Sequence, residues 1–402
     1  MNSRAIKLMF SCMILALAVL ACSDALAEDT ATNGWRGDGS GRFPNARIVT
    51  KWSADENIIW STDMPSSSNA LPILVDGKLF VCSEPTTLIC LNEKDGKILW
   101  SKSSDLKDAG AETKLPKTHR SNGYSSATPT SDGKGVYVVY GTGVAAAYEL
   151  DGTRRWIKSI ERPAGKWGHS ASPVLAGGNL IISVVNIVAL DPKTGEKVWE
   201  VKSSAVWGTP LVTQIGGEDI ILAPNGEIIR AKDGKVLTKN KLAMEYNGVL
   251  VHGGVLYGFD MHTQAYAYRL PEKITDTFTL KKLWRVRVKA DRYYASPVIH
   301  DGIMFGLTRK DVLTAVDIKA GKKLYEKNLE FSGKKDFCFP SLVIAGENLL
   351  ATSENGTTVV IKPGKTYTEI ARNKLEPFRS TPLPVGERMY IRGLKKMYCV
   401  GK

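Results

Sequence analysis

The sequence predicts an all-β protein made of repeated four-stranded sheets, and three observations support this prediction. A small residue followed by Pro, then a Gly-containing turn and an apolar run, recurs at intervals of roughly 40 residues. The repeats close on related motifs, "LNEKDGKILW" (91–100), "LDGTRRW" (150–156) and "ALDPKTGEKVW" (189–199). The segments between the turns are short and rich in β-branched and aromatic residues, which favours strands. Each copy is therefore one supersecondary unit that needs neighbours to bury its faces.

The elements of one copy follow in order from the chemistry of its residues. The opening Pro has no N–H, which suits the first residue of a strand whose donor is not needed. A Gly pair or Asp-Gly then supplies the positive φ of a two-residue hairpin, and a second strand follows, as at Val136 to Tyr140. In the clearest copy a third strand ends at Leu190, and Thr194-Gly195 turns the chain into a fourth strand ending in Trp199. Each copy is predicted to be an antiparallel meander, and helix should be nearly absent.

Eight such openings are found, at Pro72, Pro129, Pro173, Pro210, Gly248, Pro297, Pro340 and Pro382. The last copy has room for only three strands before Lys402, whereas "NIIWSTDMP" (57–65) looks like a fourth strand without the other three. Radial stacking about an axis covers both faces of every meander and leaves only short edges. We therefore predict an eight-bladed β-propeller of four-stranded antiparallel blades, closed by an N-terminal strand around Trp60 that joins the last blade.

The first 27 residues differ from the repeats and are predicted to be a signal peptide. Arg4 and Lys7 precede an apolar run, and Ala25-Leu26-Ala27 forms the small-x-small pattern of a cleavage site. The mature chain would begin with an N-terminal extension (28–56), followed by the propeller (57–402). This arrangement predicts an exported protein of the periplasm or cell envelope. Acylation of Cys22 is the alternative, and only in that case is a membrane attachment expected.

The net charge is +13, but we do not predict a nucleic-acid partner. The Lys and Arg residues are spread through the turns, which is typical of a solvated rim, and export separates the protein from nucleic acid. Cys82 and Cys90 fall on adjacent strands of one predicted hairpin. An oxidising compartment permits a disulfide there, while buried free thiols are also common in β cores, and both alternatives remain open.

The repeat ending at 189–199, with looser copies at 90–100, 149–156 and 315–325, resembles the tryptophan-docking repeat of pyrroloquinoline-quinone-like propellers. This family of eight-bladed rings includes quinoprotein alcohol dehydrogenases and the BamB-like lipoproteins of outer-membrane assembly. The resemblance covers residues 58–402 and implies the same quinoprotein-like fold. The stretch "NGWRGDGSGRFP" (33–44) is similar to a Trp- and Arg-Gly-containing segment that precedes the ring in many proteins with such repeats.

The resemblance also indicates which chemistry to look for. The dehydrogenases of the family hold the quinone under a vicinal disulfide, with calcium bound by Glu, Asn and Asp, but this sequence has no adjacent cysteines and no Cys-x-x-Cys-His haem site. The repeat Trp residues are assigned to packing between blades. The histidines show no metal-ligand spacing. We therefore predict no catalytic residue, no metal ligand and no cofactor; the alternative is a dehydrogenase using pyrroloquinoline quinone (PQQ) and calcium in a reduced site.

One set of positions is predicted to form a ligand-binding funnel. In a propeller, the loops that enter the innermost strands and those between the second and third strands converge on one face around the axis. Aromatic and Arg side chains there give large contact area and directed polar contacts, although packing between blades is the alternative interpretation. The candidate residues are His119, Arg120, Trp167, His169, Trp207, Glu245, Tyr246, Asn247, Arg292, Tyr293 and Arg379, with Tyr124, Tyr294, Asp336, Phe337 and Phe378 beside them.

These inferences predict an exported, non-catalytic propeller that serves as a binding platform. Its partner would be an envelope protein or a small-molecule or glycan ligand, and the resemblance adds a BamB-like role in envelope assembly. The protein is expected to be a monomer, because a closed ring needs no second copy for stability. The competing hypotheses are a PQQ-dependent oxidoreductase and a divergent hydrolase or lyase that uses the funnel.

Overall fold

The structure is a computed structural model that describes residues 33–165, 167–204, 207–239, 246–260, 263–275, 278–331 and 336–402. The predicted signal peptide, Cys22 and Glu245 lie outside the described residues. Within them the regular elements are all β-strands, as predicted. No helix in this part of the chain is long and apolar enough to cross a membrane.

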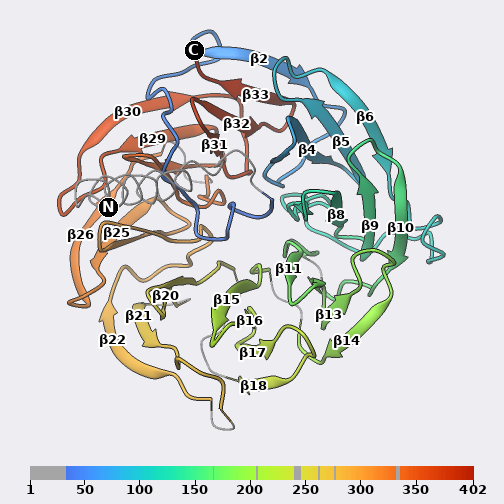
Figure 1. The fold of residues 1–402 in the computed structure, drawn as a ribbon. Helices are drawn as coiled ribbons and strands as arrows, with labels where there is room; N and C mark the ends of the chain where they lie inside the picture. Colours follow the sequence, from blue (N-terminus) through green and yellow to red (C-terminus); the bar gives the residue numbers. More distant parts are fainter. Residues whose placement is uncertain are drawn as a thin grey trace, which may run out of the picture.

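Eight antiparallel sheets stand radially around a central axis (Figure 1), which confirms the predicted propeller. Blade 1 contains β3 (Ile73–Val75), β4 (Lys78–Ser83), β5 (Thr87–Asn92) and β6 (Ile98–Ser103). Blade 2 contains β7 (Thr130–Ser131), β8 (Gly135–Val139), β9 (Val144–Glu149) and β10 (Arg154–Ser159). Blade 3 contains β11 (Val174–Ala176), β12 (Asn179–Ser183), β13 (Ile187–Leu190) and β14 (Lys197–Val201). Blade 4 contains β15 (Leu211–Ile215), β16 (Glu218–Leu222), β17 (Glu227–Arg230) and β18 (Val236–Lys239).

The second half of the ring repeats this order. Blade 5 contains β19 (Leu250–His252), β20 (Val255–Phe259), β21 (Gln264–Arg269) and β22 (Lys281–Arg287). Blade 6 contains β23 (Val298–His300), β24 (Ile303–Leu307), β25 (Val312–Asp317) and β26 (Lys322–Asn328). Blade 7 contains β27 (Val343–Ala345), β28 (Asn348–Thr352), β29 (Thr357–Ile361) and β30 (Glu369–Lys374), and β1 (Arg42–Phe43) joins it. Blade 8 contains β31 (Leu383–Val385), β32 (Arg388–Arg392), β33 (Lys396–Val400) and β2 (Ile58–Asp63).

The ring closes through β2, as predicted from the sequence. This strand pairs antiparallel with β33, with Trp60 opposite Cys399, and forms the outer edge of blade 8 near the C-terminus (Figure 1). Because β2 lies at the start of the ring and β33 at its end, the backbone hydrogen bonds between them fasten the circle. The first and last blades are therefore held by a sheet as well as by packing.

The core lies between the blades. Second and third strands such as β8 and β29 are buried along their whole length, whereas the outermost strands are mostly exposed. Between blades 1 and 2, for example, Phe80 and Tyr148 belong to one buried cluster. Burial of both sheet faces explains why these inner strands are mainly apolar rather than alternating, with buried Thr357 and Thr358 as the polar residues of β29.

A tryptophan staple joins each of five blades to the next. The indole Nε1 of Trp156 donates to the carbonyl of Pro192 at 3.0 Å, and a Cβ added to Gly195 would lie 2.7 Å from the indole ring. Gly195 also has φ +71°, so both conformation and close contact require glycine there. The other four staples run from Trp60, Trp100, Trp199 and Trp284 to the carbonyls of Glu93, Leu150, Ala231 and Ile318. The structural role assigned to these tryptophans is consistent with this geometry.

The structure corrects one detail of the repeat and decides one alternative. The innermost strand of blade 7 begins after Leu342, so Leu342 rather than Pro340 occupies the position of the opening Pro. Cys82 and Cys90 are free, buried thiols, because Cys82 lies opposite Leu88 and Cys90 opposite Phe80 in the hairpin register. Burial raises the pKa of each thiol to about 12.

Candidate functional site

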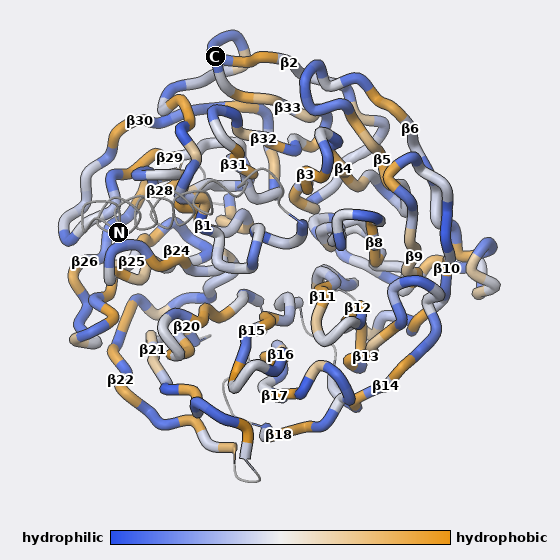
Figure 2. The backbone as a smooth tube through the Cα atoms, in the orientation of Figure 1, coloured by the Kyte–Doolittle hydropathy of each residue, from blue (hydrophilic) through white to orange (hydrophobic). Residues whose placement is uncertain are grey.

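The N-terminal segment crosses the interior of the ring instead of lying outside it. The carbonyl of Asn33 accepts hydrogen bonds from Ser131 N at 2.6 Å and Thr130 Oγ1 at 2.9 Å, in blade 2. From there the chain reaches the other side, where β1 adds in parallel to β27 inside the ring (Figure 2). Arg47 N then donates to the carbonyl of Gly386 in blade 8 at 2.7 Å. The segment therefore links blades that are far apart around the axis.

Arg36 anchors this crossing segment. Its side chain is fully buried, and its guanidinium donates to the carbonyls of Pro297 at 2.7 Å and Leu342 at 3.0 Å. These two residues occupy equivalent positions, directly before the innermost strands of blades 6 and 7. Burial lowers the pKa of Arg36 to about 9, and the charge of Asp38 opposes the shift. The guanidinium therefore stays charged at neutral pH and is held by backbone carbonyls.

Trp35 fills a space that a missing side chain leaves in the ring. A Cβ on Gly248 would lie 2.7 Å from the Trp35 indole, so the indole can occupy this position only beside a glycine. Trp35 forms part of the wall of a cavity on the axis, with a volume of about 120 Å³. At about 30 Å³ per water molecule, that volume corresponds to roughly four water molecules.

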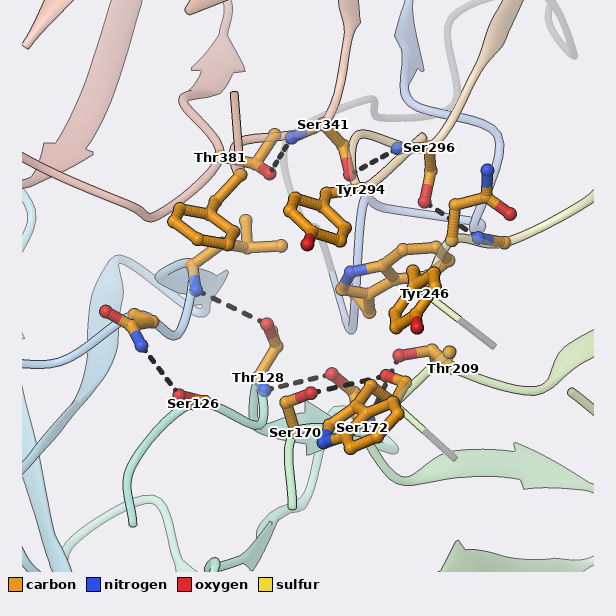
Figure 3. A pocket seen from close by; sticks show the side chains of 18 of the residues that line it. Ser126, Thr128, Ser170, Ser172, Thr209, Tyr246, Tyr294, Ser296, Ser341 and Thr381 are labelled. Carbon is orange, nitrogen blue, oxygen red and sulfur yellow. Dashed lines mark hydrogen bonds between the residues drawn. The ribbon is translucent and has the colours of Figure 1, made fainter. Parts of the chain in front are cut away.

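The lower level of this cavity carries a ring of hydroxyl groups. Backbone N–H groups of one blade donate to side-chain hydroxyls of the next, for example Thr128 N to Ser172 Oγ at 3.0 Å and Ser172 N to Thr209 Oγ1 at 3.0 Å (Figure 3). Two blades lack this hydroxyl, because blade 5 has Gly248 and blade 1 has Leu71 at the equivalent position. The hydrogen bonds from Thr209 N and Thr381 N to the next blade are therefore not formed in this way. The hydroxyl ring comprises Thr128, Ser172, Thr209, Ser296, Ser341 and Thr381.

The small residue of the repeat opening supplies this ring. Each of its members directly precedes the opening Pro or, in blade 7, Leu342. Each hydroxyl oxygen accepts a backbone hydrogen bond, and within the described residues none of the six donates its proton to a protein acceptor. A hydroxyl can accept and donate at once, so these protons are available to a molecule in the cavity.

The upper level of the cavity, which we call the mouth tier, has one residue from each blade. Every member stands two residues before the lower-level position of its blade, and alternate residues of an extended chain point to the same side. In order around the axis the mouth tier is Asn69, Ser126, Ser170, Trp207, Tyr246, Tyr294, Phe339 and Arg379. Blades 4 to 7 therefore present aromatic side chains, and blades 8 and 1 to 3 present polar ones.

The four aromatic members form a continuous arc. The rings of Trp207 and Tyr246 stack with centroids 5.6 Å apart, Tyr246 meets Tyr294 edge-on at 5.3 Å, and Tyr294 stacks on Phe339 at 5.3 Å. The guanidinium of Arg292 lies over the Tyr246 ring at 5.6 Å. This aromatic arc (Trp207, Tyr246, Tyr294 and Phe339) gives half of the cavity a wall of ring faces and edges.

The cavity carries little net charge. Arg379 is the one charged residue among the described residues that line it, and its Nε donates to Glu354 Oε2 at 2.8 Å. Glu354 also accepts a hydrogen bond from Phe337 N at 3.2 Å. In blade 1, Glu84 accepts from the backbone N–H groups of Tyr124 and Ser125 at 2.9 Å. Carboxylates near the mouth thus fasten loops between blades.

The predicted site residues fall into three groups. Trp207, Tyr246, Asn247 and Arg379 line the cavity, and Arg292 lies above Tyr246. His119 and Trp167 form a separate pair with ring centroids 4.2 Å apart; Trp167 is 56% exposed, and Arg120 is exposed nearby in the sequence.

His169 and Tyr293 are buried and do not line the cavity. Tyr293 stacks on Phe259 with ring centroids 4.8 Å apart, and its hydroxyl donates to the carbonyl of Lys289 at 3.1 Å. Burial lowers the pKa of His169 to about 4, so its imidazole is neutral at pH 7. The interpretation of these two residues as ligand contacts is corrected to packing, and Glu245 lies outside the described residues.

Several lining residues were not identified from the sequence. They are the hydroxyl ring, Trp35, Asn69, Ser126, Ser170 and Phe339. The small residue before each Pro was visible as part of the repeat, but it was used only to locate the strands. Trp35 was marked only by the resemblance of the stretch 33–44, and its place in the cavity wall could not be predicted because it depends on a contact with Gly248, more than 200 positions away.

The residues present do not fit the calcium–quinone pair of the family's dehydrogenases. No carboxylate is found among the described residues that line the cavity. In the described part of the chain there is also no group of three or more His, Cys, Asp or Glu side chains that could hold a metal ion. The sequence has no adjacent cysteines to clamp a quinone.

Comparison with known proteins gives one consistent result. A family model described as "Outer membrane protein assembly factor BamB" matches residues 45–273. The protein of that name from Yersinia pestis is 22% identical over 349 residues, covering 80% of this chain and 82% of its own. The Salmonella typhimurium protein is 22% identical over 367 residues, covering 75% and 88%.

Solved structures agree on the fold. BamB from Moraxella catarrhalis superposes with a TM-score of 0.64 at 13% identity, covering 86% of this chain and 97% of its own. The computationally designed Ika8 protein gives a TM-score of 0.61 at 10% identity, covering 86% and 100%.

Proposed function

The chain belongs to the family of the outer membrane protein assembly factor BamB, and from this premise we propose that it is an exported, non-catalytic platform that binds another protein of the cell envelope during assembly. The observation that carries the proposal is the extent of the likeness. The Yersinia pestis assembly factor matches along 80% of this chain, so the similarity includes most of the ring rather than one repeat.

The structure supports a specific contact surface for such a partner, which we call the rim surface. It consists of Leu115, His119, Arg120 and Trp167, on the loops that lead into the innermost strands of blades 2 and 3. Leu115 is 45% and Trp167 56% exposed, and His119 packs against the Trp167 ring. Exposed Trp and Arg side chains are typical of the few residues that carry most of the binding energy at protein interfaces, and Arg120 directly follows His119, which contacts Trp167.

Site-specific photo-crosslinking in the native envelope tests this assignment. A photoreactive residue at position 167 should capture a component of outer-membrane protein assembly, identified by mass spectrometry, and R120A should lower the yield. The matched control is position 301, whose side chain is 84% exposed in the turn between β23 and β24, on the opposite face of the ring. Equal capture from both positions, or capture only from position 301, would contradict the assignment.

Export is part of the same proposal. Cleavage after Ala27 should leave Glu28 as the first residue of the mature chain, which N-terminal sequencing of the purified protein will show. Incorporation of labelled fatty acid that is lost in C22S would instead establish the anchored form. Recovery of the intact precursor from the cytoplasmic fraction alone would refute export.

The oxidoreductase alternative is tested by reconstitution. Mixing the purified chain with PQQ and calcium should give no retained quinone absorbance after gel filtration and no alcohol-dependent dye reduction. This expectation follows from the donor set of the cavity, in which the described lining offers hydroxyls, amides and aromatic rings. Retention of quinone together with turnover would overturn the non-catalytic proposal.

A further inference from the structure

We propose that the axial cavity binds a single neutral sugar ring, as the terminal unit of a glycan. This site is separate from the rim surface, and its occupant is a small ligand rather than the protein partner. The inference rests on four properties of the cavity: its polar groups, its aromatic wall, its charge and its size.

Asn247 contributes an unpaired polar group. The residue lines the cavity and is 6% exposed, and within the described residues its amide has no hydrogen-bond partner. The amide is not among the fully buried side-chain groups that lack a partner, so it is accessible to water or to a ligand. An amide both donates and accepts, which matches a sugar hydroxyl that does the same.

The hydroxyl ring multiplies this polar capacity. Its six oxygens are fixed by backbone N–H groups, so their positions are set before any ligand arrives. Their protons point to no protein acceptor within the described residues. Preorganised donors of this kind reduce the entropy lost on binding. The natural complement is a molecule with several oxygen acceptors spread around a ring.

The mouth tier supplies the apolar surface against which a sugar ring can pack. Its members in blades 4 to 7 are the aromatic arc, while those in blades 1 to 3 are Asn69, Ser126 and Ser170 (Figure 3). A pyranose has one face of C–H groups and a circumference of hydroxyls, so it can place the first against aromatic rings and the second against amides and hydroxyls. The amide of Asn69 and the hydroxyls of Ser126 and Ser170 already donate to protein acceptors, so to a ligand they offer acceptor oxygens.

The charge and the size of the cavity restrict the chemical class of the ligand further. Arg379, the one charged residue of the described lining, is already paired with Glu354 at 2.8 Å, so the lining itself offers no uncompensated positive charge of the kind that a phosphate or sulfate requires. Arg292, over the Tyr246 ring, lies outside this lining. A cavity of about 120 Å³ is too small for more than one sugar ring. Because Trp35 from the crossing segment occupies the wall at the lower level, the rest of a glycan would extend outward through the mouth tier.

The test uses the mature chain with free monosaccharides. D-glucose, N-acetyl-D-glucosamine and sodium phosphate are titrated separately, and binding is followed by tryptophan fluorescence and by saturation-transfer NMR on the sugar. We expect at least one of the two sugars to bind in the millimolar range, to perturb Trp fluorescence and to show transfer to its ring C–H protons, with no effect of phosphate at constant ionic strength.

Variants locate the site. W207A removes part of the aromatic arc, and N247L replaces the amide by an apolar group of similar size. Each variant should lower the affinity for the sugar about tenfold. W167A is the matched control, because it deletes an aromatic ring of the rim surface that does not line the cavity, and it should leave sugar binding unchanged while impairing partner capture. The two proposals can therefore fail separately.

Three outcomes would overturn the sugar site. They are no saturation transfer from the wild-type chain to either sugar, binding of phosphate in place of sugar, or equal weakening by W167A and W207A. The first needs no variant, so the proposal stays falsifiable even if N247L does not fold.

Discussion

Replacement of Trp60 by Ala should destabilise the protein more than the same change at Trp199. Trp60 is 9% exposed, its Nε1 donates to the carbonyl of Glu93 at 3.1 Å, and its strand β2 is the one that closes the ring. Truncation of a buried aromatic side chain costs about 3–5 kcal/mol, and the lost hydrogen bond adds about 1 kcal/mol.

The comparison variant is W199A. Trp199 makes the same kind of hydrogen bond, to the carbonyl of Ala231 at 3.0 Å, but it is only partly buried and its blade is formed by one continuous stretch of chain. We expect W199A to cost about half as much, since less apolar surface is lost. W60F keeps most of the packing and should cost about 1–2 kcal/mol, close to the value of the hydrogen bond with a small loss of area.

The assay is equilibrium urea denaturation followed by circular dichroism, with hydrogen exchange of the amides of residues 58–63. In W60A these amides should exchange faster than in the wild type, because weakened packing allows β2 to separate from β33. A cost of W60A below about 1 kcal/mol, which is typical of a surface substitution, or unchanged exchange in β2 would refute the idea that this strand fastens the ring.

Three further results are expected. G195A should lower the stability measured by thermal denaturation by about 1–3 kcal/mol, because the added Cβ would clash with the Trp156 indole. G178A, with φ +80° and no atom within 4 Å of the added Cβ, should lose only the cost of its backbone conformation. Equal losses in the two variants would contradict the staple argument. Burial raises the pKa of the Cys82 and Cys90 thiols to about 12, so the folded state keeps protons that the unfolded state releases above pH 9. The free energy of unfolding should therefore be highest below pH 9 and fall between pH 9 and 12 by about 1.4 kcal/mol per pH unit for each thiol. In urea denaturation at a series of pH values, a C82A/C90A variant should lose less stability with rising pH than the wild type. R36M should leave two buried carbonyls without donors and cost about 2–4 kcal/mol, with faster hydrogen exchange in residues 33–47; unchanged exchange there would show that other contacts hold the segment.

The blades and their closure could be predicted from the sequence because the information is local. Turn glycines and apolar runs lie within one repeat. The turn residues Asp95, Asp151, Asp191 and Asp233 accept hydrogen bonds from backbone N–H groups two residues on, so these turns are also stabilised locally. The closing strand could also be predicted from local patterns. The last repeat has only three strands and the segment around Trp60 supplies one, so together they make a complete four-stranded blade.

The site was predicted only in part because the alternation of side chains was not applied to the loops. Tyr294 stands an even number of residues before Ser296 and turns toward the axis, whereas Tyr293 stands an odd number before it and enters the core. His169 is buried for the same reason. In blade 7 the assignment of the opening to Pro340 hid Ser341, and with it Phe339.

The crossing segment could not be predicted from any pattern. Arg36 contacts residues 261 and 306 positions away, and it lies in a glycine-rich stretch that defines no strand or helix. Such contacts depend on the shape of a finished ring. Only the resemblance to segments that precede the ring in similar proteins indicated that these residues matter.

The position of the first two strands imposes an order on biosynthesis. β1 docks on a strand that begins at Val343, and β2 on one that begins at Lys396, so neither can take its place until nearly all of the chain has been made. At the usual rate of translation, that wait lasts roughly 20–80 s. During this time β1 and β2 lack their partner strands, so the ring stays open until its last two blades have been made.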